Sequence, residues 1–209
     1  MADTGQLLYF ADPMCSWCWG FAPVINRIAA ALDDTLPVQV VLGGLAPGAT
    51  EPLSAPTKIE FRHYWEEVGR KTGQPFDFGF FERDAFVYDT EPACRAVATV
   101  RRLNPGVTLR YLTRLHEAFH AEGANVTDPW VLRALAAEVG VDGDEFATCV
   151  DQVETHEVTR ADFALSRELG VRGFPTLLLI GAEQPCVVTQ GYKTYDEVTA
   201  SLSDMFDDG

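Results

Sequence analysis

Short apolar runs separated by a helical repeat mark the first 50 residues. Leu7-Leu8-Tyr9-Phe10-Ala11 and Pro37-Val38-Gln39-Val40-Val41-Leu42 are apolar enough to be buried strands, and each ends at residues that favour a turn. Between them, from Val24 to Leu32, apolar residues recur at helical spacing. A strand, a helix and a second strand in this order predict a right-handed crossover and a parallel strand pair.

A period of 3.6 residues then dominates from Ser54 to Gly140 and predicts an all-helical block. The expected helices cover residues 59–70 behind a Thr57-x-x-Glu60 capping box, 92–103 behind Thr90, 108–121, and 129–139 behind Asp128. The segment 74–89 has five phenylalanines without a clear period, and we expect a packed loop whose aromatic rings fill the core.

The last third of the chain returns to strands. Helices are expected over residues 144–150 and 155–169, the second ending at Gly170 as a C-cap. Residues 176–180 and 186–190 are predicted to be an antiparallel pair of strands. A Thr194-x-x-Glu197 capping box then begins a final helix that reaches Met205. The whole order predicts an α/β fold interrupted by helices.

Composition supports a folded core and excludes some partners. The chain has 209 residues, of which 47% are hydrophobic, so it can bury a substantial core. Its 16 Lys and Arg against 31 Asp and Glu give a net charge of −15, which would repel nucleic acid. No apolar run approaches the roughly 20 residues that span a bilayer. The first residues lack the basic region of a signal peptide, so we expect a cytoplasmic protein without membrane partners, provided that the chain starts here naturally.

The strongest chemical signal is Cys15-Ser16-Trp17-Cys18, directly after the first strand. Two cysteines at this spacing can close a small disulfide ring, and the free amides of a helix N-terminus favour the thiolate of the first. Cys15 would then attack and Cys18 resolve. The motif could also be half of a zinc site, but the chain has no second Cys-x-x-Cys to complete one. A third interpretation, two inert thiols in the core, remains open. Pro23 also leaves open a helix that begins only there, with both cysteines in a loop.

A second signal is Gly173-Phe174-Pro175-Thr176, which opens the late strand. Together with the Cys-x-x-Cys and the proline five residues after it, this segment resembles the thioredoxin fold. The resemblance implies that Pro175 is cis and lies beside the dithiol. It also implies that Phe174 offers its backbone to an extended substrate and that Trp17 contributes to the contact surface.

The helical block between the second strand and the late helix resembles the insertion of the DsbA-like branch. Residues 12–21 and 88–96 are similar to cytoplasmic bacterial members described as predicted disulfide isomerases or FrnE-like proteins. This resemblance implies a thioredoxin-like domain of residues 1–50 and 151–209, with 51–150 as an inserted helical subdomain. Ser-Trp between the cysteines differs from periplasmic DsbA, so the behaviour of a strong oxidant is not implied.

The function that follows is a thiol-disulfide oxidoreductase of the protein disulfide isomerase or reductase type. Its expected catalytic residues are Cys15, Cys18 and Pro175, and Trp17 and Phe174 are expected to bind substrate. The substrates would be thiols or disulfides of proteins or small molecules. No bound cofactor is expected, glutathione is a candidate co-substrate, and no particular oligomeric state is implied.

Three alternatives remain. The first is a glutathione-dependent transferase or isomerase similar to the kappa class, which shares the insertion. Those proteins look to carry Ser at the position of Cys15, so the dithiol of this chain disfavours this alternative. A non-enzymatic binding module could keep the pair as a structural disulfide. His116-Glu117-Ala118-Phe119-His120 matches a zinc metallopeptidase motif, but Val126 stands where the longer pattern has its third His, so we expect no metal.

The other three cysteines are expected to be small buried hydrophobic residues rather than redox groups. They are Cys94, Cys149 and Cys186.

Overall fold

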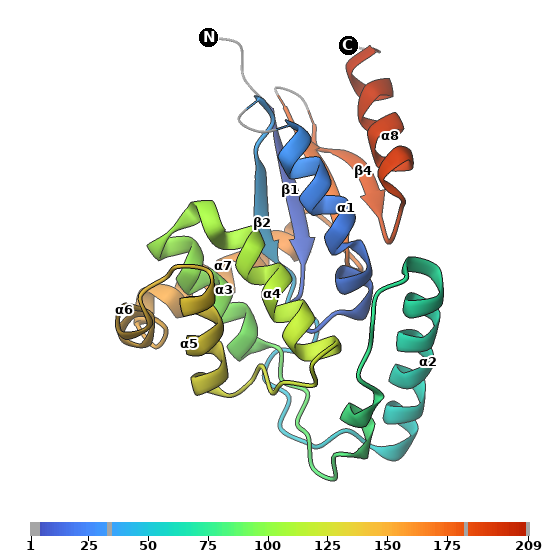
Figure 1. Cartoon of the computed structure of the whole chain (residues 1–209). Coiled ribbons are helices and arrows are strands. Elements are labelled where there is room, and N and C mark those ends of the chain that lie inside the picture. Colours follow the sequence, from blue (N-terminus) through green and yellow to red (C-terminus); the bar gives the residue numbers. More distant parts are fainter. Residues whose placement is uncertain (1–4, 33–34, 182–183, 208–209) are drawn as a thin grey trace.

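A mixed sheet forms the centre of the molecule (Figure 1). The computed structural model describes residues 5–32, 35–181 and 184–207. In these residues the strand order is β2-β1-β3-β4, with β1 (Gln6–Ala11), β2 (Val38–Leu42), β3 (Thr176–Ile180) and β4 (Cys186–Gln190). β1 runs parallel to β2 and antiparallel to β3, and β3 runs antiparallel to β4. The predicted parallel start and the predicted antiparallel pair are both confirmed.

The alternation of side chains along β1 assigns a helix layer to each face of the sheet. Leu7 and Tyr9 belong to the main core with α1 (Ser16–Leu32) and α8 (Tyr195–Asp207). Leu8 and Phe10 face the other way and pack against residues at the end of α7 (Val153–Glu168). Both faces of β1 are therefore buried, which explains its unbroken apolar sequence.

The helix that carries the dithiol continues through Pro23. α1 begins at Ser16 and includes Pro23, which is exposed. A proline has no N–H, so the carbonyl of Trp19, four residues earlier, loses its partner within the helix. The Gln74 side-chain amide donates to this carbonyl at 3.1 Å, and the Trp19 indole donates to the Pro75 carbonyl at 3.0 Å. The predicted helix start at the dithiol is thus confirmed, and the loop at residues 74–75 compensates for the proline.

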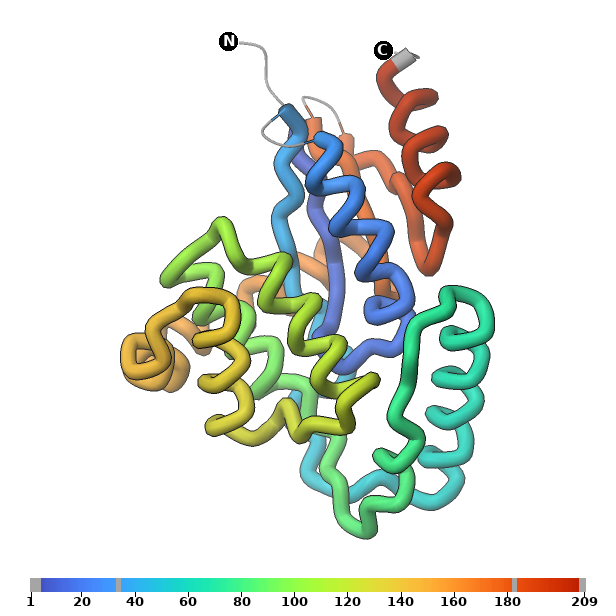
Figure 2. The backbone as a smooth tube through the Cα atoms, in the orientation of Figure 1, coloured from blue at the N-terminus to red at the C-terminus, as the bar shows by residue number. Residues whose placement is uncertain are grey.

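The chain between β2 and α7 forms a helical insertion at one end of the sheet (Figure 2). Its α-helices are α2 (Ala55–Thr72), α3 (Glu91–Leu103), α4 (Thr108–His120), α5 (Pro129–Glu138) and α6 (Gly143–Cys149). Two short 3-10 helices, η2 (Phe78–Glu82) and η3 (Pro105–Val107), lie between them. Throughout the described ranges, no helix combines the length and apolar character that crossing a membrane would require.

The predicted start of α2 is wrong. The helix begins at Ala55, and Ser54 caps it by accepting a hydrogen bond from the Thr57 amide at 3.3 Å. Pro56 lies in the first turn of the helix, a position that favours proline. The helix therefore starts before this proline and not at the Thr57-x-x-Glu60 box. By contrast, Asp128 caps α5, and Thr194 with Glu197 forms the predicted capping box before α8.

The phenylalanine-rich segment 74–89 packs around a single side chain of α2. Trp65 is 3% exposed, and its ring lies 4.8–6.2 Å from those of Phe76, Phe78, Phe80, Phe81 and Phe119. The expectation that these phenylalanines fill the core is confirmed. The cluster also fixes α2 against α4, because Phe119 belongs to α4.

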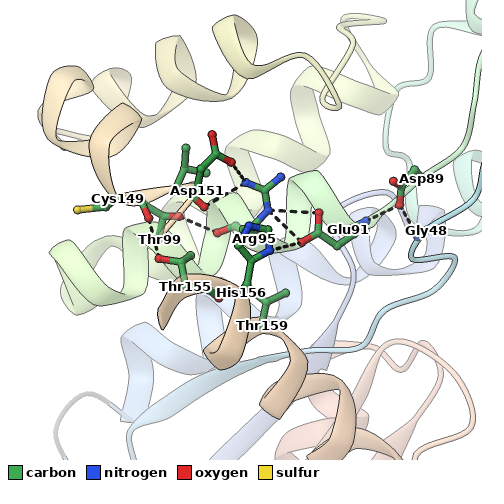
Figure 3. A network of polar contacts seen from close by, with 11 residues as sticks. Gly48, Asp89, Glu91, Arg95, Thr99, Cys149, Asp151, Thr155, His156 and Thr159 are labelled. Atoms are coloured by element: carbon green, nitrogen blue, oxygen red, sulfur yellow. Dashed lines mark hydrogen bonds and ion pairs between the residues drawn. The ribbon is translucent and has the colours of Figure 1, made fainter. Parts of the chain in front are cut away.

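Two arginines of α3 connect the insertion to the sheet domain. Arg95 pairs with Glu91 and the Asp151 carboxylate, and it donates to the Val150 carbonyl at 3.0 Å (Figure 3). Arg101 makes a two-pronged ion pair with Asp162 of α7 at 2.8 and 3.0 Å. Asp162 in turn accepts from the Leu42 amide of β2 at 3.0 Å, so α3, α7 and the sheet meet at this pair.

Candidate active site

The dithiol lies where β1 passes into α1. Cys15 precedes the first residue of α1, and Cys18 lies one turn inside the helix. Cys15 is 7% exposed and Cys18 is completely buried, and both are free thiols. The arrangement therefore gives one thiol access to the surface and conceals the other, as the sequence pattern predicts.

The Phe174-Pro175 peptide bond is cis, which confirms the expectation from the family resemblance. The Cys15 thiol lies 3.7 Å from the carbonyl oxygen of Phe174, at the distance of a weak S–H···O hydrogen bond. The dithiol and the proline segment, about 160 residues apart in the sequence, thus meet at one point.

Gly43, at the end of β2, makes room for the Phe174 ring. A Cβ at Gly43 would lie 2.0 Å from the nearest carbon of that ring, a distance that no real side chain could occupy. The neighbouring Gly44 has a φ of +67°, which few other residues adopt. Gly43 therefore allows close packing against the proline segment, whereas a Cβ at Gly44 would lie 2.9 Å from the Phe163 ring of α7.

A cavity of about 350 Å³ opens beside the Cys15 thiol. Its walls are almost entirely apolar and include residues of the sheet domain and of the insertion. They are Met14, Cys15, Ser16, Trp17, Leu45, Ala46, Phe61, Tyr64, Trp65, Tyr88 and Phe174. Trp17 is half-buried, with its ring 6.2 Å from that of Tyr192 and the Lys71 amine 5.6 Å from its centre. The cavity suits an apolar group attached close to a sulfur atom.

Asp12 organises the loop before the dithiol. It is completely buried and accepts hydrogen bonds from the Met14 amide at 2.9 Å and the Leu45 amide at 2.7 Å. The Cys94 thiol lies 3.5 Å from the same carboxylate. Burial raises the pKa of Asp12, although these hydrogen bonds oppose the shift.

His116 and Tyr88 support this loop through contacts with its carbonyl oxygens, and His120 in turn contacts His116. His116 Nε2 lies 3.0 Å from the Asp12 carbonyl oxygen, and the Tyr88 hydroxyl donates to the Met14 carbonyl. His120 Nδ1 contacts the His116 carbonyl within α4 at 2.9 Å. Burial lowers the pKa of His116 to about 4 and that of His120 to about 3, so both rings are neutral near pH 7.

The His116-Glu117-x-x-His120 segment is used for this support. Glu117 is exposed and lies 3.7 Å from Arg114, which also pairs with Glu122 and Glu138. Among the described residues no group of three His, Cys, Asp or Glu side chains is arranged to hold a metal ion. The ligand geometry that a catalytic zinc requires is therefore not assembled around these histidines.

The Cys18 thiol is completely shielded from solvent. Burial raises the pKa of Cys18 well above its ordinary value, and the neighbouring Cys15 thiol adds to the shift. Cys18 therefore needs local help to carry a negative charge.

The three remaining cysteines differ in their surroundings. Cys94 is completely buried, as expected. The expectation of burial is wrong for Cys186, which is exposed at the start of the edge strand β4, and for Cys149, which is half-buried at the end of α6. An apolar neighbourhood in the sequence does not show which side of a strand or helix end faces solvent.

Asp12 and Tyr88 were not predicted as site residues. Asp12 has a signal in the sequence, because a charged residue rarely ends a buried strand without a structural or chemical reason. Tyr88 belongs to the segment 88–96 that carries the family resemblance, but this resemblance assigned it no role.

Comparisons with known proteins agree with this geometry. The model of the DSBA-like thioredoxin domain matches residues 6–201. A solved candidate protein disulfide isomerase from Nitrosomonas europaea is 32% identical, with a TM-score of 0.92 and 99% of each chain covered.

A second solved structure is the cytosolic disulfide reductase DsbM from Pseudomonas aeruginosa, 30% identical with a TM-score of 0.80 over 98% of this chain and all of that one. The same reductase solved with GSH is 27% identical, with a TM-score of 0.77, and covers 97% of this chain and 99% of that one. The ClpXP adapter protein SpxH from Halalkalibacterium halodurans is 22% identical over 208 residues, covering 96% of this chain and 67% of the adapter.

Proposed function

Because the chain belongs to the family of DSBA-like thioredoxin domains, we propose that it is a thiol-disulfide oxidoreductase whose redox pair is Cys15 and Cys18. The observation that carries the proposal is the meeting of an accessible Cys15 at the start of α1 with a buried Cys18 and the cis Phe174-Pro175 bond. This geometry supports an asymmetric pair in which only one sulfur can meet a substrate.

The reaction runs as two disulfide exchanges. The Cys15 thiolate attacks a substrate disulfide, forms a new bond to one sulfur and releases the other as a thiolate. Cys18 then loses its proton, attacks Cys15 in the mixed disulfide and releases the second substrate thiolate. The substrate gains two electrons and the protein keeps a Cys15–Cys18 disulfide, which two equivalents of a thiol such as glutathione reopen. The reverse sequence oxidises a dithiol substrate.

More specifically, we propose that the protein is a reductase or isomerase that uses glutathione as its co-substrate. Similarity to DsbM, which has been solved with GSH, supports this choice. Trp17 and Phe174 border the cavity and would contact the substrate, and Pro175 would hold the Phe174 carbonyl toward it. We also propose that the protein acts in the cytosol, because DsbM is described as a cytosolic reductase.

A second candidate is an adapter that binds proteins without redox turnover. The similarity to SpxH over nearly the whole chain favours it. The two candidates differ in their need for Cys15, because binding alone does not consume a thiol. A glutathione-dependent transferase or isomerase is less well supported, since this chain has a dithiol where those relatives carry Ser.

Turnover in a glutathione buffer tests the proposal. A peptide with one glutathione mixed disulfide is mixed with reduced glutathione, and its reduction is followed with wild-type protein and with Cys15→Ser. We expect catalysis by the wild type alone. Equal rates with both proteins would favour the adapter.

The reduction potential of the pair, measured across a glutathione series, assigns the direction. A value near about −270 mV indicates a reductant, and a value near about −120 mV an oxidant.

A further inference from the structure

The Tyr9 hydroxyl is a buried polar group without a well-formed hydrogen bond. Tyr9 lies on β1, is completely buried and has its ring 5.9 Å from that of Phe21. Within the described part of the chain, no donor or acceptor meets hydrogen-bond geometry with its oxygen. Two other buried tyrosines are paired: Tyr111 donates to the Leu132 carbonyl at 2.9 Å, and Tyr88 donates to the Met14 carbonyl. An unpaired buried hydroxyl costs stability, so its presence calls for an explanation.

The polar side chain beside this hydroxyl is the Cys18 thiol. Tyr9 and Cys18 are both completely buried, and the Tyr9 ring contacts that of Phe21, which follows Cys18 by three residues and shares its face of α1. Burial is the largest cause that raises the pKa of Tyr9, and the charge of an ionised Cys18 is the next, followed by that of Cys15. A neutral thiol is a weak acceptor, which fits a hydroxyl left without a good partner in the dithiol form. A thiolate at the same place would be a strong acceptor.

We propose that the Tyr9 hydroxyl is a catalytic hydrogen-bond donor to the Cys18 thiolate. The inference rests on the proposed function, because it concerns the step in which Cys18 carries charge. An external thiolate attacks Cys15 of the closed disulfide, and a new bond forms between the two sulfurs. The Cys15–Cys18 bond breaks, its electron pair stays on Cys18, and the Tyr9 O–H donates to that sulfur until solvent supplies a proton.

The same donor acts in the opposite direction. When Cys18 resolves a mixed disulfide on Cys15, it passes through the same thiolate and the same transition state. Tyr9 keeps its proton throughout, because its pKa is well above the ordinary value. A donor already in place costs no reorganisation at the moment of reaction.

The other groups near Cys18 are less suited to this task. Asp12 is negatively charged when ionised, which would oppose a thiolate on Cys18, and both of its oxygens accept other hydrogen bonds. Cys15 is the sulfur under attack and has no proton to offer in the disulfide. The Asp12 backbone amide lowers the pKa of Cys18, but burial outweighs this effect, so a second donor would still stabilise the thiolate. The Tyr9 hydroxyl suits this task because it keeps its proton and has no other hydrogen-bond partner among the described residues.

A pair of matched variants tests this role. Tyr9→Phe and Tyr111→Phe each remove one hydroxyl from a completely buried ring, but Tyr111 donates to a helix carbonyl of α5 rather than facing the thiols. The Cys15–Cys18 disulfide of each full-length protein is opened with dithiothreitol, and the rate is followed by stopped-flow tryptophan fluorescence. Urea unfolding of the dithiol form is measured in parallel.

We expect opposite effects from the two changes. Tyr9→Phe should slow disulfide opening about tenfold or more, because a hydrogen bond to an ion is lost, and should leave the urea midpoint unchanged or higher. Tyr111→Phe should leave the opening rate within about twofold and lower the midpoint, because a satisfied hydrogen bond is lost. Alkylation of Cys15 in the reduced protein by iodoacetamide should proceed equally in both variants.

Three outcomes overturn the inference. An unchanged opening rate in Tyr9→Phe removes the role of Tyr9 while leaving the proposed function intact. Equal slowing by both variants assigns the effect to packing. A wild-type protein whose cysteines form no disulfide that dithiothreitol opens contradicts the proposed function itself, and the role of Tyr9 with it.

Discussion

The Phe174 ring lies on the backbone of Gly43, where a methyl group would be 2.0 Å from it. Gly43→Ala should therefore displace Phe174 and its carbonyl from the Cys15 thiol. We expect a loss of about 1–3 kcal/mol in the free energy of unfolding and a larger relative loss in disulfide exchange. Urea unfolding and the turnover assay measure the two effects.

Gly181→Ala is the control for this substitution, since no atom lies within 4 Å of its added Cβ. It should change neither quantity. Full activity in Gly43→Ala would show that the position of Phe174 does not matter for exchange.

His116 should make the protein less stable in acid. The pKa of its ring in the fold is about 4, below the ordinary 6.5, because burial opposes the charged form. The unfolded chain therefore binds a proton that the folded protein excludes, so this contribution to stability is complete above pH 6.5 and is lost as the pH falls toward 4. His116→Gln should flatten the fall of the urea midpoint between pH 6.5 and 4.

His63→Gln is the matched control, because the His63 side chain is 73% exposed. It should leave the pH dependence as in the wild type. Identical slopes for wild type and His116→Gln would contradict the buried neutral state of His116.

At the residue level the sequence motifs located the dithiol and the proline segment that meet in the structure, but they did not identify the residues that support them. Cys15, Cys18 and Pro175 stand in short motifs whose spacing carries a chemical meaning. The support by Asp12 and His116 depends on α4 docking behind β1, more than 100 residues away in the chain. The spacing of two histidines on one helix face fits a metal site and a structural pair equally well, and only tertiary contacts distinguish them.

The ion pair between Arg101 and Asp162 connects three elements, α3, α7 and β2. Their side chains are 17% and 10% exposed, and Arg101 also donates to the Val40 carbonyl at 2.7 Å. Arg101→Gln leaves the Asp162 charge buried without its partner, which should reduce the free energy of unfolding by about 3 kcal/mol. Urea unfolding at pH 7 gives the value.

Arg167→Gln, at an exposed position of the same α7, should change stability by less than about 0.5 kcal/mol. The double variant Arg101→Gln with Asp162→Asn should lose less than the sum of the single losses, since no charge is then left unpaired. Additive losses would mean that the two side chains do not interact.

At the level of elements, the periodicity of apolar residues predicted most helices and strands. The first residues of the helices depended instead on local capping contacts. Ser54 and Pro56 together begin α2 earlier than its apolar repeat does. Thr90 stands at the predicted start of α3, but its hydroxyl accepts from the Ala46 amide at 3.1 Å instead of capping its own helix. A side chain with two possible partners cannot be assigned from the sequence alone.

The whole molecule builds its cavity from two separate stretches of chain. The sheet domain supplies Cys15, Trp17 and Phe174, and the insertion supplies Phe61 and Tyr64 from α2. The helical period of residues 54–140 predicted an all-helical block, and the family resemblance identified this block as an insertion. The approach of α2 to the dithiol was not predictable, because it follows from the aromatic cluster around Trp65 and the contact between Gln74 and Trp19.

Tyr64 tests whether this shared cavity selects substrates. Its side chain is 44% exposed, so Tyr64→Ala should leave the fold intact while removing one wall. We expect kcat/KM to fall about tenfold for peptide disulfides with an aromatic residue next to the cysteine, because apolar contact area is lost. For hydroxyethyl disulfide the change should stay within about twofold.

Ile59→Ala, on the same helix and 59% exposed, lies outside the cavity and should have neither effect. A uniform fall for both substrates in Tyr64→Ala would show that the cavity does not discriminate between them.

The different roles of Cys15 and Cys18 can be measured directly by trapping mixed disulfides with glutathione. Cys15→Ser and Cys18→Ser are each exposed to oxidised glutathione, and intact-protein mass spectrometry counts the glutathione bound. Because Cys15 reaches the cavity and Cys18 is completely buried, Cys18→Ser should accumulate one mixed disulfide at position 15, and Cys15→Ser should trap almost none at position 18. Peptide mapping separates these sites from the exposed Cys186. Equal trapping at positions 15 and 18, or trapping at neither, would contradict the account.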